Sequence, residues 1–159
     1  AAVFLTTGEW VVGLISDGGQ RSITVSVFGL GMVKVPLRQV RGIVSPAGRA
    51  GQALATLEAD LRAQPAADGA GDVIRLANGE SLTGTVTAIT PKNLTLASEL
   101  GDVPIEQKVV QVVKLTNPMH PAPGAGDPPR LWLEMKYGSR LLLSELKLTA
   151  HTFRLTRYD

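Results

Sequence analysis

The amino-acid sequence predicts an all-β protein built from tandem small barrels or strongly curled meanders. Three observations carry this prediction. One short strand-turn-strand pattern recurs along the 159 residues, apolar and polar side chains alternate within each occurrence, and a helical spacing of apolar residues is found in one stretch only. A pattern that recurs at a fixed interval is typical of supersecondary units that stack to bury a shared core.

The recurrence relates the beginning of the chain to its middle at an offset of 71 residues. An extra residue in the first occurrence then changes the offset to 70, where Gly31 aligns with Gly101. A third occurrence begins at Leu131, at an offset of 59 from the second, and lacks the last part of the pattern. The aligned pairs include Leu5 with Leu76, Gly8 with Gly79, Gly13 with Gly84, Leu76 with Met135, Gly79 with Gly138, and Leu94 with Phe153.

Alternation of apolar and polar residues places the strands. Leu82, Gly84 and Val86 alternate with threonines, which is typical of a strand with one buried face. Asn78 and Gly79 predict a two-residue type I′ turn, which requires positive φ at both residues. The mid-strand glycines, Gly13 and Gly84, predict a sharp bend or the close approach of another backbone. Strands are expected at about 2–6, 10–16, 22–28, 32–37, 39–44, 72–77, 81–89, 93–98, 102–106 and 109–115, with structural turns also at Gly8, Gly31, Gly101 and Gly138.

The one helical pattern lies at about 48–65, where Leu54, Leu57 and Leu61 recur at spacings of three and four. Its narrow apolar stripe predicts a helix that covers an open edge or end of one barrel. The proline-rich stretch that follows the second unit predicts a stiff, extended linker. The expected organisation is a first β-barrel unit at 1–46, a helical linker at 47–70, a second β-barrel unit at 71–117, a proline-rich linker at 118–130, and a hairpin from an incomplete third unit at 131–159.

No arrangement of residues predicts catalysis, and we expect no enzyme activity, cofactor or metal site. The chain has no cysteine and two histidines, His120 in the linker and His151 in a predicted turn, which we interpret as exposed side chains. Glu9 and Glu80 occupy equivalent turn positions and are interpreted as polar turn residues. No glycine-rich loop has the spacing of a phosphate cradle.

Charge and aromatic content direct attention to the third unit. The net charge is +2 overall, whereas residues 130–159 alone carry +3. Aromatic residues make up 4% of the chain, so platforms for stacking bases or sugars are scarce and the sequence argues against nucleic acid. An incomplete unit leaves strand edges unfilled. We therefore expect a protein partner, or a missing part of the same polypeptide, to contact Trp132, Tyr137, Arg140, Arg154 and Arg157. No apolar run approaches the roughly 20 residues of a membrane-spanning helix.

The second unit resembles Sm-like small barrels. Val73-Ile74-Arg75-Leu76-Ala77-Asn78-Gly79 followed by Leu82-Thr83-Gly84-Thr85-Val86 is similar to that family's first motif, and Asn93-Leu94 matches the pair that follows it. The second motif of the family, an apolar residue followed by Arg-Gly, is absent after Val110. Since the nucleotide pocket of the family needs both motifs, the resemblance implies an Sm-like or SH3-like barrel and does not imply the pocket.

Nearly the whole chain resembles repeated units of large secreted proteins of planctomycete-type bacteria. The shared form is apolar-x-Leu-x-x-Gly-x-x-Leu-x-Gly-x-Val, with Ala- and Pro-rich linkers, and 131–141 is similar to the start of such a unit. The resemblance implies an exported setting, whether periplasmic, envelope or extracellular. We expect a non-catalytic structural or protein-interaction module within a larger protein or assembly. The alternatives are nucleic-acid binding by Sm-like barrels and carbohydrate binding through Trp10 or Trp132.

Overall fold

The computed structural model describes residues 1–45, 56, 58–59, 61, 71–99, 101–117, 131–148 and 153–157, with Leu148 and 153–157 described by their backbone alone. The described chain is all-β, and its antiparallel strands form two sheets. We refer to 1–45 as the first segment, 71–117 as the second segment and 131–157 as the third segment.

The first two segments contain strands in the same order, each with a 3₁₀ turn before the last strand. In the first segment these elements are β1 (Ala2–Leu5), β2 (Trp10–Val12), β3 (Leu14–Gly18), β4 (Ser22–Val27), β5 (Gly31–Pro36), η1 (Leu37–Gln39) and β6 (Val40–Val44). In the second they are β7 (Asp72–Leu76), β8 (Ser81–Ile89), β9 (Asn93–Ser98), β10 (Gly101–Glu106), η2 (Gln107–Val109) and β11 (Val110–Lys114). The third segment contains β12 (Leu131–Glu134), β13 (Arg140–Leu148) and β14 (Phe153–Arg157).

Two expectations about the strands are wrong. The strand expected at 10–16 is broken at Gly13 into β2 and β3, whereas the corresponding β8 runs without interruption. The third segment is a meander of three strands and not a hairpin, because β14 pairs with β13. The register between β13 and β14 is irregular between Leu143 and Glu145.

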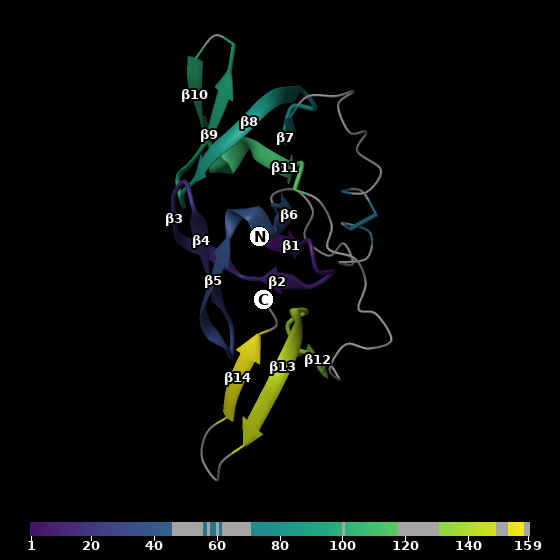
Figure 1. Ribbon diagram of the computed structural model, residues 1–159. Coiled ribbons are helices and arrows are strands. Elements are labelled where there is room, and N and C mark those ends of the chain that lie inside the picture. Colours follow the sequence, from purple (N-terminus) through teal and green to yellow (C-terminus); the bar gives the residue numbers. More distant parts are fainter. Residues whose placement is uncertain are drawn as a thin grey trace.

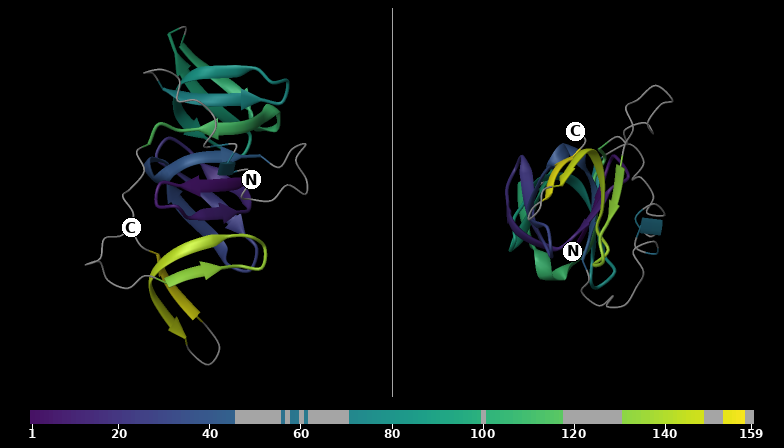
Figure 2. Two further views of the ribbon diagram at one scale, coloured as in Figure 1. Left: turned by 90° about the vertical axis from the view of Figure 1, so that its right-hand side faces the viewer. Right: turned by 90° about the horizontal axis from the view of Figure 1, so that it is seen from below.

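The segments follow one another in space in the order second, first, third. The main sheet runs β10-β9-β8-β7-β11-β6-β1-β2-β13-β12, with β14 beside β13, while β3-β4-β5 forms the smaller sheet. Figure 1 shows the second segment at the top, the first in the middle and the third at the bottom. Seen from below, the ribbons curve around a common centre (Figure 2). The main sheet therefore crosses both of the boundaries expected between units.

The main core consists of aliphatic side chains from all three segments. It includes Val3, Val25, Ile74, Leu94 and Leu141, all of them buried. A second cluster lies on the other face of β1 and β6, where Phe4 and Val44 pack with Leu61. Burial of side chains on both faces explains why β1 reads as a continuous apolar run instead of an alternating one.

Leu61 belongs to the stretch for which a helix was expected at 48–65. Thr56, Glu58, Ala59 and Leu61 have helical backbone, and the other residues of that stretch lie outside the described chain, as do the linker at 118–130 and both histidines. Leu61 is fully buried. It lies on the face of the sheet at β6, because a Cβ added to Gly42 would be 2.5 Å from Cδ1 of Leu61. Leu61 therefore packs on a face of the sheet, and not over the edge or end of a barrel as expected.

The first turn of each segment has one conformation, and it is not the predicted type I′ turn. The Gly79 amide donates to the Leu76 carbonyl at 3.0 Å, and Gly79 alone takes positive φ (89°), because no described residue other than glycine has positive φ. This is a type I turn followed by a glycine bulge. Gly8 (87°) and Gly138 (91°) repeat it.

The mid-strand glycines lie where two backbones approach closely. A Cβ on Gly13 would stand 2.2 Å from the Ser26 carbonyl oxygen, and one on Gly84 would stand 2.4 Å from that of Ala97. Both distances are too short for any side chain. Leu143 occupies the corresponding position in the third segment, so its strands cannot approach each other in the same way.

Candidate interaction site

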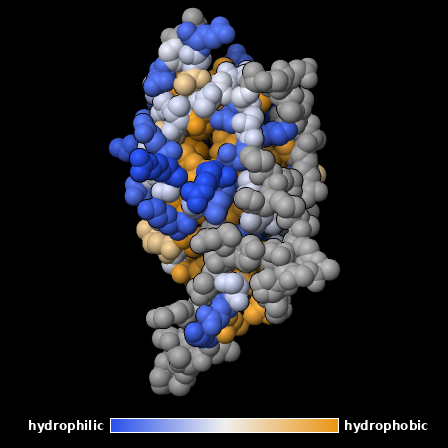
Figure 3. Space-filling model, in the orientation of Figure 1, coloured by the Kyte–Doolittle hydropathy of each residue, from blue (hydrophilic) through white to orange (hydrophobic). Residues whose placement is uncertain are grey.

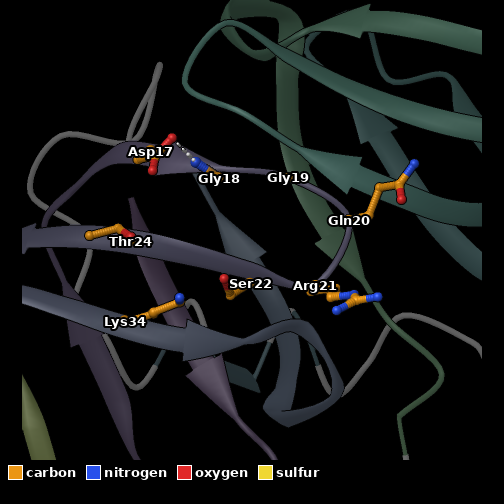
Figure 4. A pocket seen from close by; sticks show the side chains of 8 residues that line it. All are labelled: Asp17, Gly18, Gly19, Gln20, Arg21, Ser22, Thr24 and Lys34. Atoms are coloured by element: carbon orange, nitrogen blue, oxygen red, sulfur yellow. Dashed lines mark hydrogen bonds between the residues drawn. The ribbon is translucent and has the colours of Figure 1, made fainter.

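The described residues contain no group of three or more His, Cys, Asp or Glu side chains that could hold a metal ion. No described helix is long and apolar enough to cross a membrane. An open depression of about 460 Å³ lies at the β3–β4 turn, lined by side chains that include Asp17, Gln20, Arg21 and Lys34. Figure 4 shows Asp17 bonded to the amide of its own neighbour, Gly18. The four side chains are exposed, and we assign no ligand to this depression.

The second segment joins the first through their last strands. β11 pairs antiparallel with β6, with Val113 opposite Ile43. Two backbone hydrogen bonds extend this ladder: Ser45 N donates to the Gln111 oxygen at 2.8 Å, and Leu115 N donates to the Arg41 oxygen at 2.9 Å. The offset of 70 relates these two bonds to each other, so the junction has the form of a local two-fold axis through the Ile43–Val113 pair.

The third segment joins the first through their second strands. Arg140 of β13 lies opposite Trp10 of β2. The Val12 amide donates to Ser139 Oγ at 2.9 Å, and the Leu142 amide donates to Glu9 Oε1, also at 2.9 Å. An interval of 130 residues separates Val12 from Leu142 and Glu9 from Ser139, so this junction also has a local two-fold form.

Glu9 is the buried anchor of this junction. Its side chain is 1% exposed, and Thr7 Oγ1 donates to its second carboxylate oxygen at 2.6 Å. A buried carboxylate requires such donors because removing its charge from water is costly. Its counterpart Glu80 is exposed and bonds within its own turn to Asn78. Interpreting Glu9 as a polar turn residue therefore missed its contact with the third segment.

Arg140 lies between two tryptophans. Its guanidinium carbon is 5.3 Å from the centre of the Trp10 ring and 4.1 Å from that of Trp132. Trp10 Nε1 also donates to the Gly138 carbonyl at 2.6 Å. Stacking of a cation on aromatic faces contributes about 0.5–2 kcal/mol, depending on exposure. The structure thus brings together two residues expected to contact a partner, Trp132 and Arg140, and places Arg140 within the junction.

Tyr137 makes a second contact with the first segment. Its ring packs edge-on against Phe28, with ring centres 4.5 Å apart. Phe28 remains 69% exposed and Tyr137 55%, so the pair stays open to solvent. The remaining residues expected at a partner contact, Arg154 and Arg157, lie on β14.

The third segment has unfilled strand edges among the described residues. β1 lies between β2 and β6, and β7 lies between β8 and β11, but β12 has only β13 beside it. β4 and β9 are likewise paired on both sides, whereas β14 pairs only with β13. Leu131 (51% exposed) and Trp132 (44%) are accordingly open to solvent.

The second segment is polar at positions of its first two strands that are apolar in the first segment, although Val103 and Val109 elsewhere in it are exposed. The second segment carries Arg75, Ser81 and Thr83 at the positions where the first has Phe4, Trp10 and Val12. Its first turn and the start of β8 are exposed, with Glu80 and Ser81 open to solvent. In Figure 3, hydrophobic surface is visible through the middle of the molecule, and hydrophilic side chains dominate the upper end.

Comparisons with known proteins supply no further assignment, since no family model, curated protein or solved structure matches this chain.

Proposed function

We propose that this chain is a non-catalytic structural and protein-interaction module, made of three diverged copies of one Sm-like or SH3-like β unit. The equal offsets between corresponding strands support the repeat, because each strand of the second segment begins within a residue of the position that the offset predicts. The third segment is the interaction end. We place the module within a larger exported bacterial protein or assembly, in keeping with the resemblance to secreted planctomycete-type proteins.

The observation that carries the proposal is that β12 and β14 each pair with one strand among the described residues, whereas the corresponding β1, β4, β7 and β9 pair with two. Arrays of stacked repeats require a polar outer face where stacking stops. The second segment has polar side chains at Arg75, Ser81 and Thr83, with Val103 exposed on its edge strand β10, whereas the third exposes the larger Leu131 and Trp132 beside an unpaired strand. An unpaired edge next to apolar side chains is a template for adding a strand from another chain.

Carbohydrate binding is the second candidate, because Trp132 stays 44% exposed even though Arg140 stacks on its ring. Trp10 is a weaker candidate, since its Nε1 group bonds to Gly138 and its ring lies against Arg140. Nucleic-acid binding rests on the Sm-like resemblance alone. The exposed strand edge itself favours peptide binding over carbohydrate and nucleic-acid binding.

One experiment compares the three candidates. The immobilised chain is offered a random peptide display library, a glycan array and a single-stranded oligonucleotide at low and physiological salt. We expect enrichment of related peptides and no retention of glycans or oligonucleotide. Oligonucleotide retention with a steep salt dependence would favour nucleic acid instead, and glycan retention that is lost on Trp132→Ala would favour carbohydrate.

A further inference from the structure

The arrangement of the first two segments indicates what would fill the third. In each of them a strand, a 3₁₀ turn and a second strand bridge the two outer strands of a three-stranded meander. In the first segment β5 pairs with β4 and β6 pairs with β1. In the second, β10 pairs with β9 and β11 pairs with β7. The third segment has the meander β12-β13-β14 and no described residues in the bridging position.

We propose that the third segment binds a strand–3₁₀ turn–strand segment from outside residues 1–159, which pairs with β14 through its first strand and with β12 through its second. This inference rests on the proposed interaction function and specifies its partner. A second copy of this chain is not the donor, because both of its bridging segments are already paired within their own units: β6 lies between β1 and β11, and β11 lies between β7 and β6.

The outward-facing amides of β12 can be identified from its pairing with β13. Leu142 lies opposite Trp132, and its amide donates away from β12, to Glu9. Residues that face each other across an antiparallel pair either exchange both hydrogen bonds or exchange neither. Trp132 therefore directs its N–H and C=O toward the free edge, and so does Glu134, two residues further along the strand.

The side chains beside this edge are apolar and incompletely covered. Leu133 corresponds to Val3 and Ile74, both 0% exposed with β6 or β11 alongside, but Leu133 itself is only half-buried. Met135 is likewise only half-buried against the core. A strand added at this edge would complete the burial of Leu133, as β6 and β11 do for Val3 and Ile74.

The composition of the partner follows from the two bridging segments that the chain already contains. Their core residues are β-branched and recur at the first, sixth and ninth positions of a nine-residue stretch: Val35, Val40 and Ile43 in the first segment, and Ile105, Val110 and Val113 in the second. All six are buried. We therefore expect a partner segment with Val or Ile at this spacing and polar residues across the turn.

The test uses the intact chain and a fluorescein-labelled synthetic peptide with the sequence of residues 101–115, whose binding is followed by fluorescence anisotropy. We expect saturable binding of one peptide per chain. Replacing Val110 and Val113 of the peptide with lysine should weaken binding at least tenfold, because lysine cannot be buried in the core without a partner. The lysine substitutions are made in the peptide alone, so the folded chain is the same in both measurements.

A pair of variants locates the site. Glu134→Pro removes an amide that faces the free edge, whereas Glu134→Ala removes the same side chain and keeps the amide. Proline is tolerated on an unpaired strand edge, and thermal unfolding checks that both variants fold. We expect at least tenfold weaker binding for Glu134→Pro and less than a twofold change for Glu134→Ala.

Three results would overturn the inference: no binding of the unmodified peptide, binding that Glu134→Pro leaves unchanged whatever the lysine substitutions do, or self-association of the chain that Glu134→Pro abolishes. The second of these includes exchange of the peptide into the second segment. If the display library yields peptides whose binding does not respond to Glu134→Pro, the interaction function stands and this site is wrong. If the library yields no peptide at all, the interaction function itself fails.

Discussion

Replacing Glu9 with alanine should weaken the attachment of the third segment to the first. The substitution removes the acceptor of the Leu142 amide, which is buried in the junction. Leaving a buried donor unsatisfied costs about 1–3 kcal/mol, and relief of the desolvation of the carboxylate offsets part of this. We therefore expect the free energy of unfolding of the junction to fall by about 2 kcal/mol, or roughly 4–8 °C in Tm for a chain of this size.

Intrinsic fluorescence can report this change, because the two tryptophans of the chain, Trp10 and Trp132, both lie against Arg140 in the same junction. Urea unfolding followed by tryptophan emission should show an earlier transition for Glu9→Ala. The matched control is Glu80→Ala at the equivalent but exposed position, which should change stability by no more than about 0.5 kcal/mol. The reasoning is refuted if both variants unfold with the parent chain, or if Glu80→Ala costs as much as Glu9→Ala.

Three further substitutions test the packing by thermal or urea unfolding. Gly84→Ala should destabilise the chain by about 1–3 kcal/mol, since the new Cβ would lie 2.4 Å from the Ala97 carbonyl oxygen. The control Gly19→Ala should be near neutral, because no described atom lies within 4 Å of the Cβ it would add. Equal losses of stability for the two variants would contradict the close approach at Gly84. Asp72→Ala should cost about 2–4 kcal/mol because the buried carboxylate accepts from two backbone amides and one hydroxyl; a cost under 0.5 kcal/mol would show that these bonds are not formed. Thr6→Val should be neutral or stabilising by up to about 1 kcal/mol, because the buried Thr6 hydroxyl has no hydrogen-bond partner among the residues that the structure describes, and a clear loss of stability would reveal a partner.

Much of the fold could be predicted because it is local. Period-two alternation places β8 and β9 at the residues expected, 81–89 and 93–98. The first turn is positioned by its glycine, but the type I′ geometry expected for Asn78 and Gly79 is wrong, because a type I turn with a glycine bulge needs positive φ at Gly79 alone. The break at Gly13 was also not predictable, since the same pattern around Gly84 gives a continuous strand.

The junctions between segments could not be predicted from hydrophobic pattern. Glu9 and Glu80 occupy equivalent positions in the sequence, yet one is buried and the other exposed, because only the first meets the third segment. The aligned sequences did contain a signal for the junction between the first and third segments. Positions that are apolar in the first segment, Phe4 and Trp10, are Arg75 and Ser81 in the second, and this difference marks the segment whose second strand has a neighbouring segment beside it.

The most direct test of the arrangement is a nuclear Overhauser spectrum of the labelled chain. In the junction of the last strands, Val44 faces Val112 and Gly42 faces Lys114. The Ser45–Gln111 bond makes both of these non-hydrogen-bonded pairs, whose Cα atoms lie about 4.5 Å apart and whose Hα protons are in close contact. We predict strong Hα–Hα cross-peaks for both pairs, together with a contact between the Leu142 amide proton and the Glu9 side chain. Intact strands within each segment without these cross-peaks would contradict the arrangement of three β units joined through equivalent strands.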